Sequence, residues 1–224
     1  MTAEKFVAEL LGTGTLILLG DGVVAGVLLA KSKAQNAGWI VITFGWAIAV
    51  FSGIAVAGLT SGAHINPAVT LAVFLDSAAN NGSFGADQLI GYWAAQMLGA
   101  FIGATLVFIH YYPHWEQTED PGLKLGVFST GPAIRNPMWN LVSEIIGTFV
   151  LVFVGFSLAK GTTPAIGGAL SWGLLVLVIG LCLGGTTGYA INPARDLGTS
   201  TTCAAASARK SETRRQSRMI SRTQ

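Results

Sequence analysis

The sequence predicts an all-α membrane protein, and three observations carry that prediction. Of its 224 residues, 51% are hydrophobic and only 11% are charged, whereas a soluble domain carries about a quarter charged residues. Five mostly apolar segments are long enough to cross a bilayer, for which a helix needs about 20 residues. Two further apolar segments are too short to cross, and each contains Asn-Pro-Ala. We therefore expect a multi-pass protein of the cell membrane, in contact with the lipid bilayer.

Polar connections separate the five expected spans. In chain order we place the spans at residues 6–30, 38–59, 87–109, 140–159 and 164–183. The longest connection follows the third span and holds four prolines among charged residues, so it is expected to be an extended external loop. The first span carries Glu9 and Asp21 and has no basic leader beyond Lys5, which argues against a cleavable signal peptide.

The two short segments, residues 61–75 and 184–197, are expected to enter the membrane and turn back as half-helices. In Asn-Pro-Ala the Asn can cap a helix by accepting from backbone N–H groups, and Pro at the first helical position loses no needed donor. One such tripeptide is explained by capping alone, but two copies at equivalent places in a repeat indicate a pore. The motif residues are Asn66, Pro67, Ala68, Asn192, Pro193 and Ala194.

The chain repeats itself in inverted form. Residues 8–13 (Ala-Glu-Leu-Leu-Gly-Thr) return as residues 143–148 (Ser-Glu-Ile-Ile-Gly-Thr), and the six residues ending in the first Asn-Pro-Ala return 126 positions later. An odd number of spans before the second copy places it upside down in the membrane. The predicted organisation is a first repeat (1–110), an external connecting loop (111–137), a second repeat with two spans (138–198) and a disordered basic polar tail (199–224).

Two half-helices that enter from opposite faces meet near the midplane with their N-termini facing each other. Each N-terminus carries about half a positive charge, and together they form an electrostatic barrier to cations and protons. Non-helical backbone is tolerated at this depth only where it lines a cavity or is buried in protein. We therefore expect the residues before each motif to line the pore, namely Gly62, Ala63, His64, Ile65, Thr187 and Gly188.

These motifs resemble the aquaporin family over about residues 4–198. The resemblance lies in the paired Asn-Pro-Ala motifs, the string Ser-Gly-Ala-His-Ile-Asn-Pro-Ala-Val-Thr (61–70) and the repeated Glu-x-x-Gly-Thr. Asn-Pro-Ala-Arg-Asp (192–196) is similar to the glycerol-facilitator branch. The resemblance implies an aquaporin-like fold and passive, bidirectional diffusion of glycerol, water and similar small neutral solutes. It also implies a homotetramer with one pore per subunit, without cofactor or metal.

The resemblance further implies a selectivity filter of Trp46, Gly180, Tyr189 and Arg195. Arg195 would donate to solute hydroxyls and repel cations, although alone it also reads as an interfacial arginine that reaches the headgroups. Gly180 would leave room where water-selective relatives have His. Trp46 and Tyr189 would form an apolar wedge for a carbon backbone. Without the resemblance, Trp46 reads as a core or interfacial aromatic residue.

Three acidic residues are expected to brace the re-entrant loops. Glu9 and Glu144 occupy matching places in the repeat, and the resemblance implies that they accept hydrogen bonds from the backbone N–H groups of the loops. Each alone also reads as an interfacial residue near a helix start. Asp196 would brace the second loop, and its alternative role is that of a carboxylate favoured by a helix N-terminus.

The family continues to a sixth span, whereas residues 199–224 contain no run able to cross. This segment holds six of the 13 basic residues but one of the 11 acidic ones, so the rest of the chain is net acidic and shows no patch for nucleic acid. The chain is thus expected to be truncated before the sixth span. There are two alternatives to a passive solute channel. One is a non-conducting family member, and the other is a secondary transporter, which would need a coupling-ion site. The sequence contains no phosphate-binding loop, no metal-ligand spacing and no nucleophile–base pair, so an enzyme is not expected.

Overall fold

The computed structural model describes residues 1–161 and 166–200, and the regular structure in these ranges is helical. Four helices in the described ranges are long and apolar enough to cross a membrane. They are α1 (Ala3–Leu28), α2 (Trp39–Ser61), α4 (Ala86–His110) and α7 (Pro137–Gly161). The fifth predicted span corresponds to α8, which is described over the 17 residues Ile166–Cys182. Of the predicted disordered tail (199–224), residues 201–224 lie outside the described residues, whereas Thr199 and Ser200 are helical and Thr199 is fully buried.

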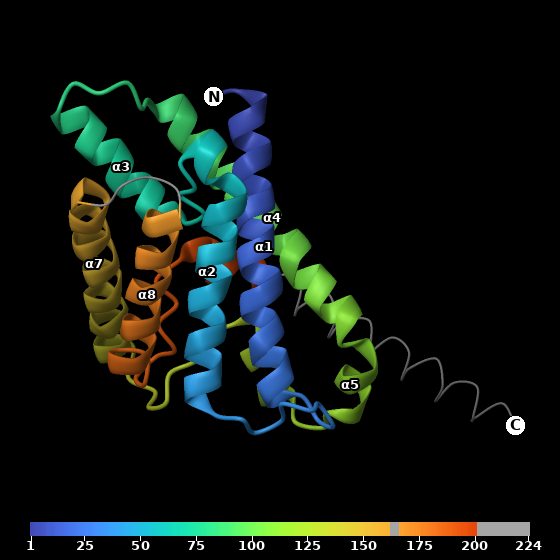
Figure 1. Cartoon of the computed structure of the whole chain (residues 1–224). Helices are drawn as coiled ribbons and strands as arrows, with labels where there is room; N and C mark the ends of the chain where they lie inside the picture. The colour runs from blue at the N-terminus through green and yellow to red at the C-terminus, as the bar shows by residue number, and fades with distance from the viewer. Residues whose placement is uncertain (162–165, 201–224) are drawn as a thin grey trace, which may run out of the picture.

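The first motif begins a short helix, as the sequence predicts. Pro67 is the first residue of α3 (Pro67–Ala79), and Asn66 caps that helix by accepting from the backbone N–H of Ala68. The second motif leads into η1, a π-helical turn of five residues, Ala194–Gly198. Figure 1 shows the chain after α8 returning to the middle of the bundle, behind α2 in this view. There its backbone accepts a hydrogen bond from the Asn66 side chain.

The connection between the two repeats differs from the expected extended loop, because it contains two helices. These are α5 (Tyr112–Gln117) and α6 (Pro121–Phe128), and both carry Pro in the first turn, where the missing N–H is not needed. The last two residues of α6, Val127 and Phe128, are fully buried, and α6 packs against α1. The connection folds because it has apolar side chains to bury. Its prolines and charged residues favoured the prediction of an extended loop, which left these apolar residues out.

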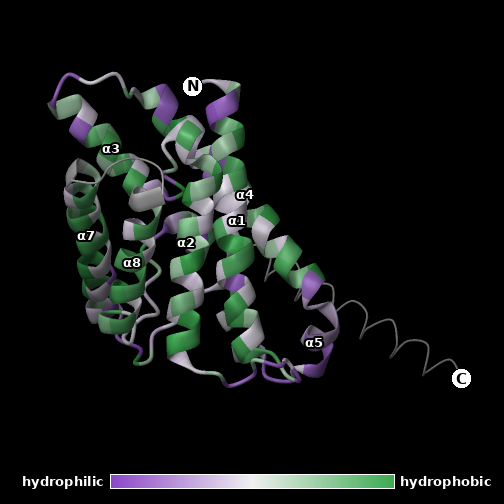
Figure 2. Cartoon of the chain, viewed as in Figure 1, coloured by the Kyte–Doolittle hydropathy of each residue, from purple (hydrophilic) through white to green (hydrophobic). Residues whose placement is uncertain are grey.

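Small residues allow the helices to approach closely, as in other membrane bundles. A Cβ on Gly12 would lie 2.7 Å from Ala57 Cβ on α2, and one on Gly103 would lie 2.6 Å from the backbone oxygen of Gly14 on α1. Figure 2 shows that hydrophobic residues also cover the outward faces of the long helices. On α7 these include Ile146, Phe149 and Phe153, which are about half or more exposed. Such faces fit a lipid environment.

The inverted repeat extends to the packing of tryptophans. A Cβ on Gly20 would lie 2.3 Å from the Trp46 ring, and a Cβ on Gly155 would lie 2.2 Å from the Trp172 ring. The glycines are separated by the same 135 residues as the two Glu-x-x-Gly-Thr sequences, and the tryptophans by the same 126 residues as the two Asn-Pro-Ala motifs. Each half therefore places an indole ring over a helix glycine in the same way.

Asp21 on α1 provides a first testable prediction. Its side chain is fully buried, and neither of its carboxyl oxygens finds a hydrogen-bond partner among the described residues. Because an unsatisfied buried polar group costs about 1–3 kcal/mol, Asp21→Val is expected to stabilise the fold by a similar amount. Asp21→Asn keeps the polar atoms and should gain far less. Thermal unfolding in detergent measures both variants, and a lower midpoint for Asp21→Val would contradict this account.

Candidate solute pore

The two loops that precede the motifs follow the same backbone path. Each begins with a left-handed glycine, Gly62 (φ 86°) or Gly188 (φ 90°). Left-handed residues then recur at positions that match by the 126-residue repeat: Ala63 and Ile65 in the first loop, Tyr189 and Ile191 in the second. This conformation costs a non-glycine residue about 1–2 kcal/mol, so it persists only where surrounding contacts impose it.

Glu9 supplies those contacts for the first loop. Its carboxylate is fully buried and accepts four hydrogen bonds of 2.6–2.8 Å. The donors are the Ser61 hydroxyl, the backbone N–H groups of His64 and Ile65, and the Gln96 side-chain amide. Glu9 therefore lies where the sequence predicts a loop-bracing carboxylate.

Glu144 supplies half as many contacts for the second loop. Its two oxygens accept from the backbone N–H groups of Ala190 and Ile191, each at 3.1 Å, and its side chain is partly buried. Asp196, the third expected brace, accepts from the backbone N–H and hydroxyl of Thr130 at 3.0 and 2.9 Å. Asp196 thus ties the second motif to the connection between the repeats.

The two motif asparagines hold the loops together. Asn66 Nδ2 donates to the backbone oxygen of Ile191 at 2.9 Å, and Asn192 Nδ2 donates to the backbone oxygen of Ile65 at 3.0 Å. Each side-chain oxygen also accepts from the backbone N–H two residues later, at Ala68 and Ala194. Since an amide nitrogen carries two hydrogens, each asparagine retains one donor beyond the loop that it contacts.

A cavity of about 240 Å³ lies between the two halves and is lined by residues of both. Its apolar wall comes mainly from α2, α3, α7 and α8, and includes both Trp46 and Trp172. Its polar side chains are His64, Asn66, Asn192 and Arg195, together with Tyr189. Of the residues predicted to line the pore, Gly62, Ala63, His64 and Ile65 line this cavity, while Thr187 and Gly188 lie outside its lining.

Arg195 and Trp46 lie in contact at one part of this cavity. The Arg195 guanidinium carbon is 5.0 Å from the centre of the Trp46 ring, a cation–π geometry. Arg195 is buried, and Nη1 lies 3.5 Å from an Asp196 carboxylate oxygen. Within the described residues this is the guanidinium's only hydrogen bond or ion pair, so most of its donors are free for a solute.

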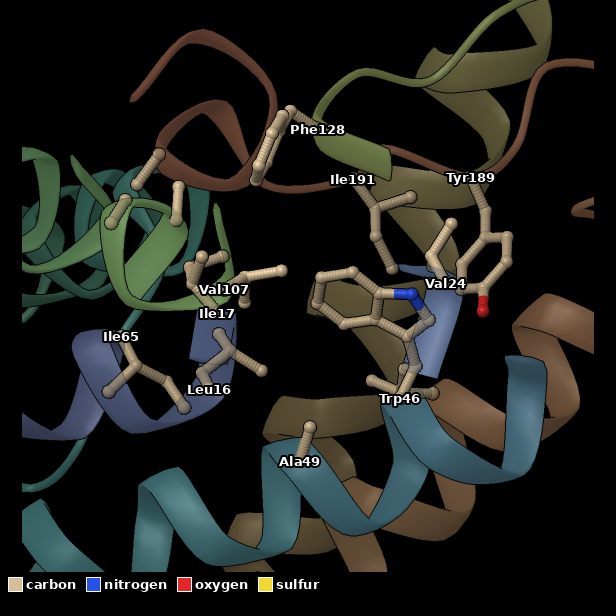
Figure 3. Packing of buried hydrophobic residues seen from close by; sticks show 14 of the residues in the cluster. Leu16, Ile17, Val24, Trp46, Ala49, Ile65, Val107, Phe128, Tyr189 and Ile191 are labelled. Atoms are coloured by element: carbon tan, nitrogen blue, oxygen red, sulfur yellow. The ribbon is translucent and has the colours of Figure 1, made fainter. Parts of the chain in front are cut away.

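Gly180 and Tyr189 also lie in contact, but Gly180 does not line the cavity. A Cβ on Gly180 would lie 2.9 Å from Tyr189 Cζ and 2.8 Å from Thr43 Cγ2. The space left by the missing side chain is therefore occupied by the phenol ring of Tyr189. Figure 3 shows the Trp46 ring from α2 and the Tyr189 ring from the second loop approaching the same region, close to Ile191.

Sequence reasoning missed three residues that hold this site: Ser61, Gln96 and Thr130. Gln96 is a single polar residue within an apolar span, and it is fully buried between Glu9 and Thr70. Its type and position were a usable signal, because buried polar residues in membrane spans need partners. Ser61 and Thr130 are small hydroxyl residues of the kind found in many loops, so their types gave no comparable signal.

The comparisons with known proteins agree with this architecture. The family model described as "Major intrinsic protein" matches residues 1–208. Glycerol uptake facilitator protein 3 of Lactiplantibacillus plantarum is 55% identical over 196 residues, 88% of this chain and 80% of that protein. The glycerol uptake facilitator protein of Bacillus subtilis is 50% identical over 203 residues, 88% of this chain and 70% of that protein.

The fold also matches a solved structure. The X-ray structure of the aquaglyceroporin from Plasmodium falciparum superposes with a TM-score of 0.72 and 30% sequence identity, covering 91% of this chain and 81% of that one. Family match, relatives and fold agree with the paired motifs and the cavity between them. The chain belongs to the major intrinsic protein family.

Proposed function

We propose that this integral membrane protein is a channel, not an enzyme, for the passive and bidirectional diffusion of glycerol and other small neutral solutes, including water. The observation that carries the proposal is the cavity between the two Asn-Pro-Ala loops, with Arg195 held against Trp46 inside it. Relatives that are 50–55% identical and named glycerol uptake facilitators support the choice of solute.

The arrangement suits a molecule with hydroxyl groups along one side and carbon along the other. Arg195 offers planar N–H donors, and Asn66 and Asn192 each offer one amide hydrogen. The aromatic ring of Trp46 and the aliphatic side chains of the cavity wall offer no competing hydrogen bonds. Glycerol can satisfy its hydroxyls on the polar side while its carbon backbone packs on the apolar side.

The same groups explain why ions and protons would be excluded. Arg195 adds a full positive charge to the cavity, and the N-terminus of α3 adds a partial one. An entering cation meets both charges, while the apolar wall offers no replacement for its water shell. We further propose that four chains assemble as a homotetramer, which the outward apolar faces of α2, α4 and α7 would allow. Mass measurement of the purified protein tests the assembly.

Removing the Arg195 charge tests the filter. Arg195→Ala is expected to raise cation or proton leak at least tenfold, corresponding to a barrier lowered by about 1.4 kcal/mol, while glycerol still passes. A pH-sensitive dye inside proteoliposomes measures the leak. Arg135→Ala, which removes an exposed arginine from the connection between the repeats, should behave as wild type. Equal leak from all three proteins would place the barrier elsewhere.

A further inference from the structure

Trp39, the first residue of α2, contacts two of the four filter residues although it does not line the cavity. Its indole Nε1 donates to the backbone oxygen of Gly180 at 3.0 Å. Its ring meets the Tyr189 ring edge to face, with centroids 5.7 Å apart and planes at 84°. The ring of Tyr189 therefore lies between the cavity and Trp39.

Both rings fit against one glycine-rich part of α8 and the chain that follows it. A Cβ on Gly184 would lie 2.4 Å from Tyr189 Cδ1 and 2.8 Å from Trp39 Cζ2. A Cβ on Gly180 would meet the other end of the phenol ring. The two glycines thus leave a slot that the Tyr189 ring fills, and Trp39 covers the slot from α2.

No hydrogen bond fixes the orientation of the Tyr189 side chain. Its hydroxyl is buried and has no hydrogen-bond partner among the described residues. Its backbone is left-handed (φ 43°), a conformation that a bulky residue adopts only under constraint. The ring is held by packing alone, and the Trp39 ring is the one aromatic contact that Tyr189 makes in the described part of the chain.

We propose that Trp39 is a positioning residue that sets the width of the solute filter by holding the Tyr189 ring against α8. This inference rests on the proposed channel function, because the filter is defined by the solute that it selects. Without the indole, the phenol ring can move into the vacated space and away from the lumen. The filter then becomes wider and discriminates less between a short polyol and a longer one.

The competing role for Trp39 is that of a membrane-interface anchor, since Trp is enriched where a span leaves the bilayer. Trp39 is 39% exposed, which is compatible with either role. Trp139 provides the matched control. It lies in the first turn of α7 and is 67% exposed, and its indole has no hydrogen bond or ring contact within the described residues. If Trp39 is only an interface anchor, replacing either tryptophan should have a similar effect on the filter. If Trp39 positions the Tyr189 ring, only its own replacement should change the filter.

The first test follows the Tyr189 ring directly and does not require flux. The protein is labelled with 3-fluorotyrosine, and the Tyr189 signal in the ¹⁹F NMR spectrum is assigned with Tyr189→Phe. Trp39→Leu is expected to broaden or split this signal, because the ring is no longer held in one position, while Trp139→Leu leaves it unchanged. A change of chemical shift alone follows from the lost ring current of the indole, so a Tyr189 signal as sharp in a folded Trp39→Leu protein as in wild type would overturn the proposal.

The second test compares solutes in proteoliposomes. We expect Trp39→Leu to raise the erythritol-to-glycerol permeability ratio about tenfold, the lower end of what a methylene-sized misfit is worth in an apolar pocket. Trp39→Phe keeps an aromatic edge and should show a smaller rise, and Trp139→Leu none. An unchanged ratio in Trp39→Leu, with wild type conducting glycerol, refutes the filter role. Absence of glycerol flux in wild type refutes the channel function instead, and the NMR result then decides whether Trp39 holds the ring.

Discussion

Glu9→Gln is expected to destabilise the protein more than an equivalent change at any other loop-bracing carboxylate. Glutamine keeps one acceptor oxygen and replaces the other by an NH₂ group that faces two existing donors. Two of the four hydrogen bonds of Glu9 are therefore lost. At about 1.5–3 kcal/mol for each bond to a charged acceptor, the expected cost is about 3–6 kcal/mol, a large part of the stability of a typical domain.

Glu144→Gln is the matched control, because Glu144 holds the second loop from the equivalent position of the repeat with half as many hydrogen bonds. It accepts two bonds of 3.1 Å and is partly buried, so that one bond is lost and the cost should be about half or less. The thermal unfolding midpoint in detergent ranks the two variants, and glycerol flux shows whether the loops keep their path. If Glu144→Gln were the more damaging change, the four donors around Glu9 would not be what fixes the first loop.

Gly180→Leu is expected to have the largest effect on transport. A Cβ at this position already lies 2.8–3.0 Å from Thr43 and from the tip of the Tyr189 ring. A leucine side chain must push the phenol ring out of its slot and toward Arg195. We expect glycerol flux to fall by about 10- to 100-fold, a barrier raised by about 1.4–2.8 kcal/mol. Gly180→Ala should reduce glycerol flux less, because its methyl group displaces only the tip of the Tyr189 ring and the end of the Thr43 side chain.

Gly168→Leu controls for the effect of a leucine on the same helix. Position 168 belongs to α8, and a Cβ there meets no heavy atom within 4 Å among the described residues. Flux per reconstituted protein should stay at the wild-type level in this variant. If both leucine variants lost a comparable share of glycerol flux, any larger side chain on α8 would be harmful. The effect of Gly180→Leu would then not be specific to the contact with Tyr189.

The sequence predicts the framework of this fold well, because the framework depends on the length and apolarity of its segments. Four of the five expected spans are found as helices of spanning length, and α8 corresponds to the fifth. The chain also enters α3 at Pro67, as the capping chemistry of Asn66 predicts. Within the described residues, a clear difference is the connection between the repeats, where α6 forms because its apolar end packs against α1.

The site is predictable only where chemistry is tied to a motif. Glu9, Glu144 and the two motif asparagines make hydrogen bonds that follow from their places in the repeat. The place of Gly180 does not follow, because a missing side chain does not say which neighbour fills the space. The contacts of Trp39 depend on how α2 packs against α8, which spacing along one chain cannot reveal.

Conduction of glycerol through the cavity between the two Asn-Pro-Ala loops is the activity expected of this chain. Stopped-flow light scattering tests it on proteoliposomes that contain this 224-residue chain, under an inward glycerol gradient after insertion is verified. Reswelling is expected to be clearly faster than in empty liposomes and to be slowed at least tenfold by Gly180→Leu. Reswelling no faster than in empty liposomes, with the protein correctly inserted, would rule out conduction through this cavity.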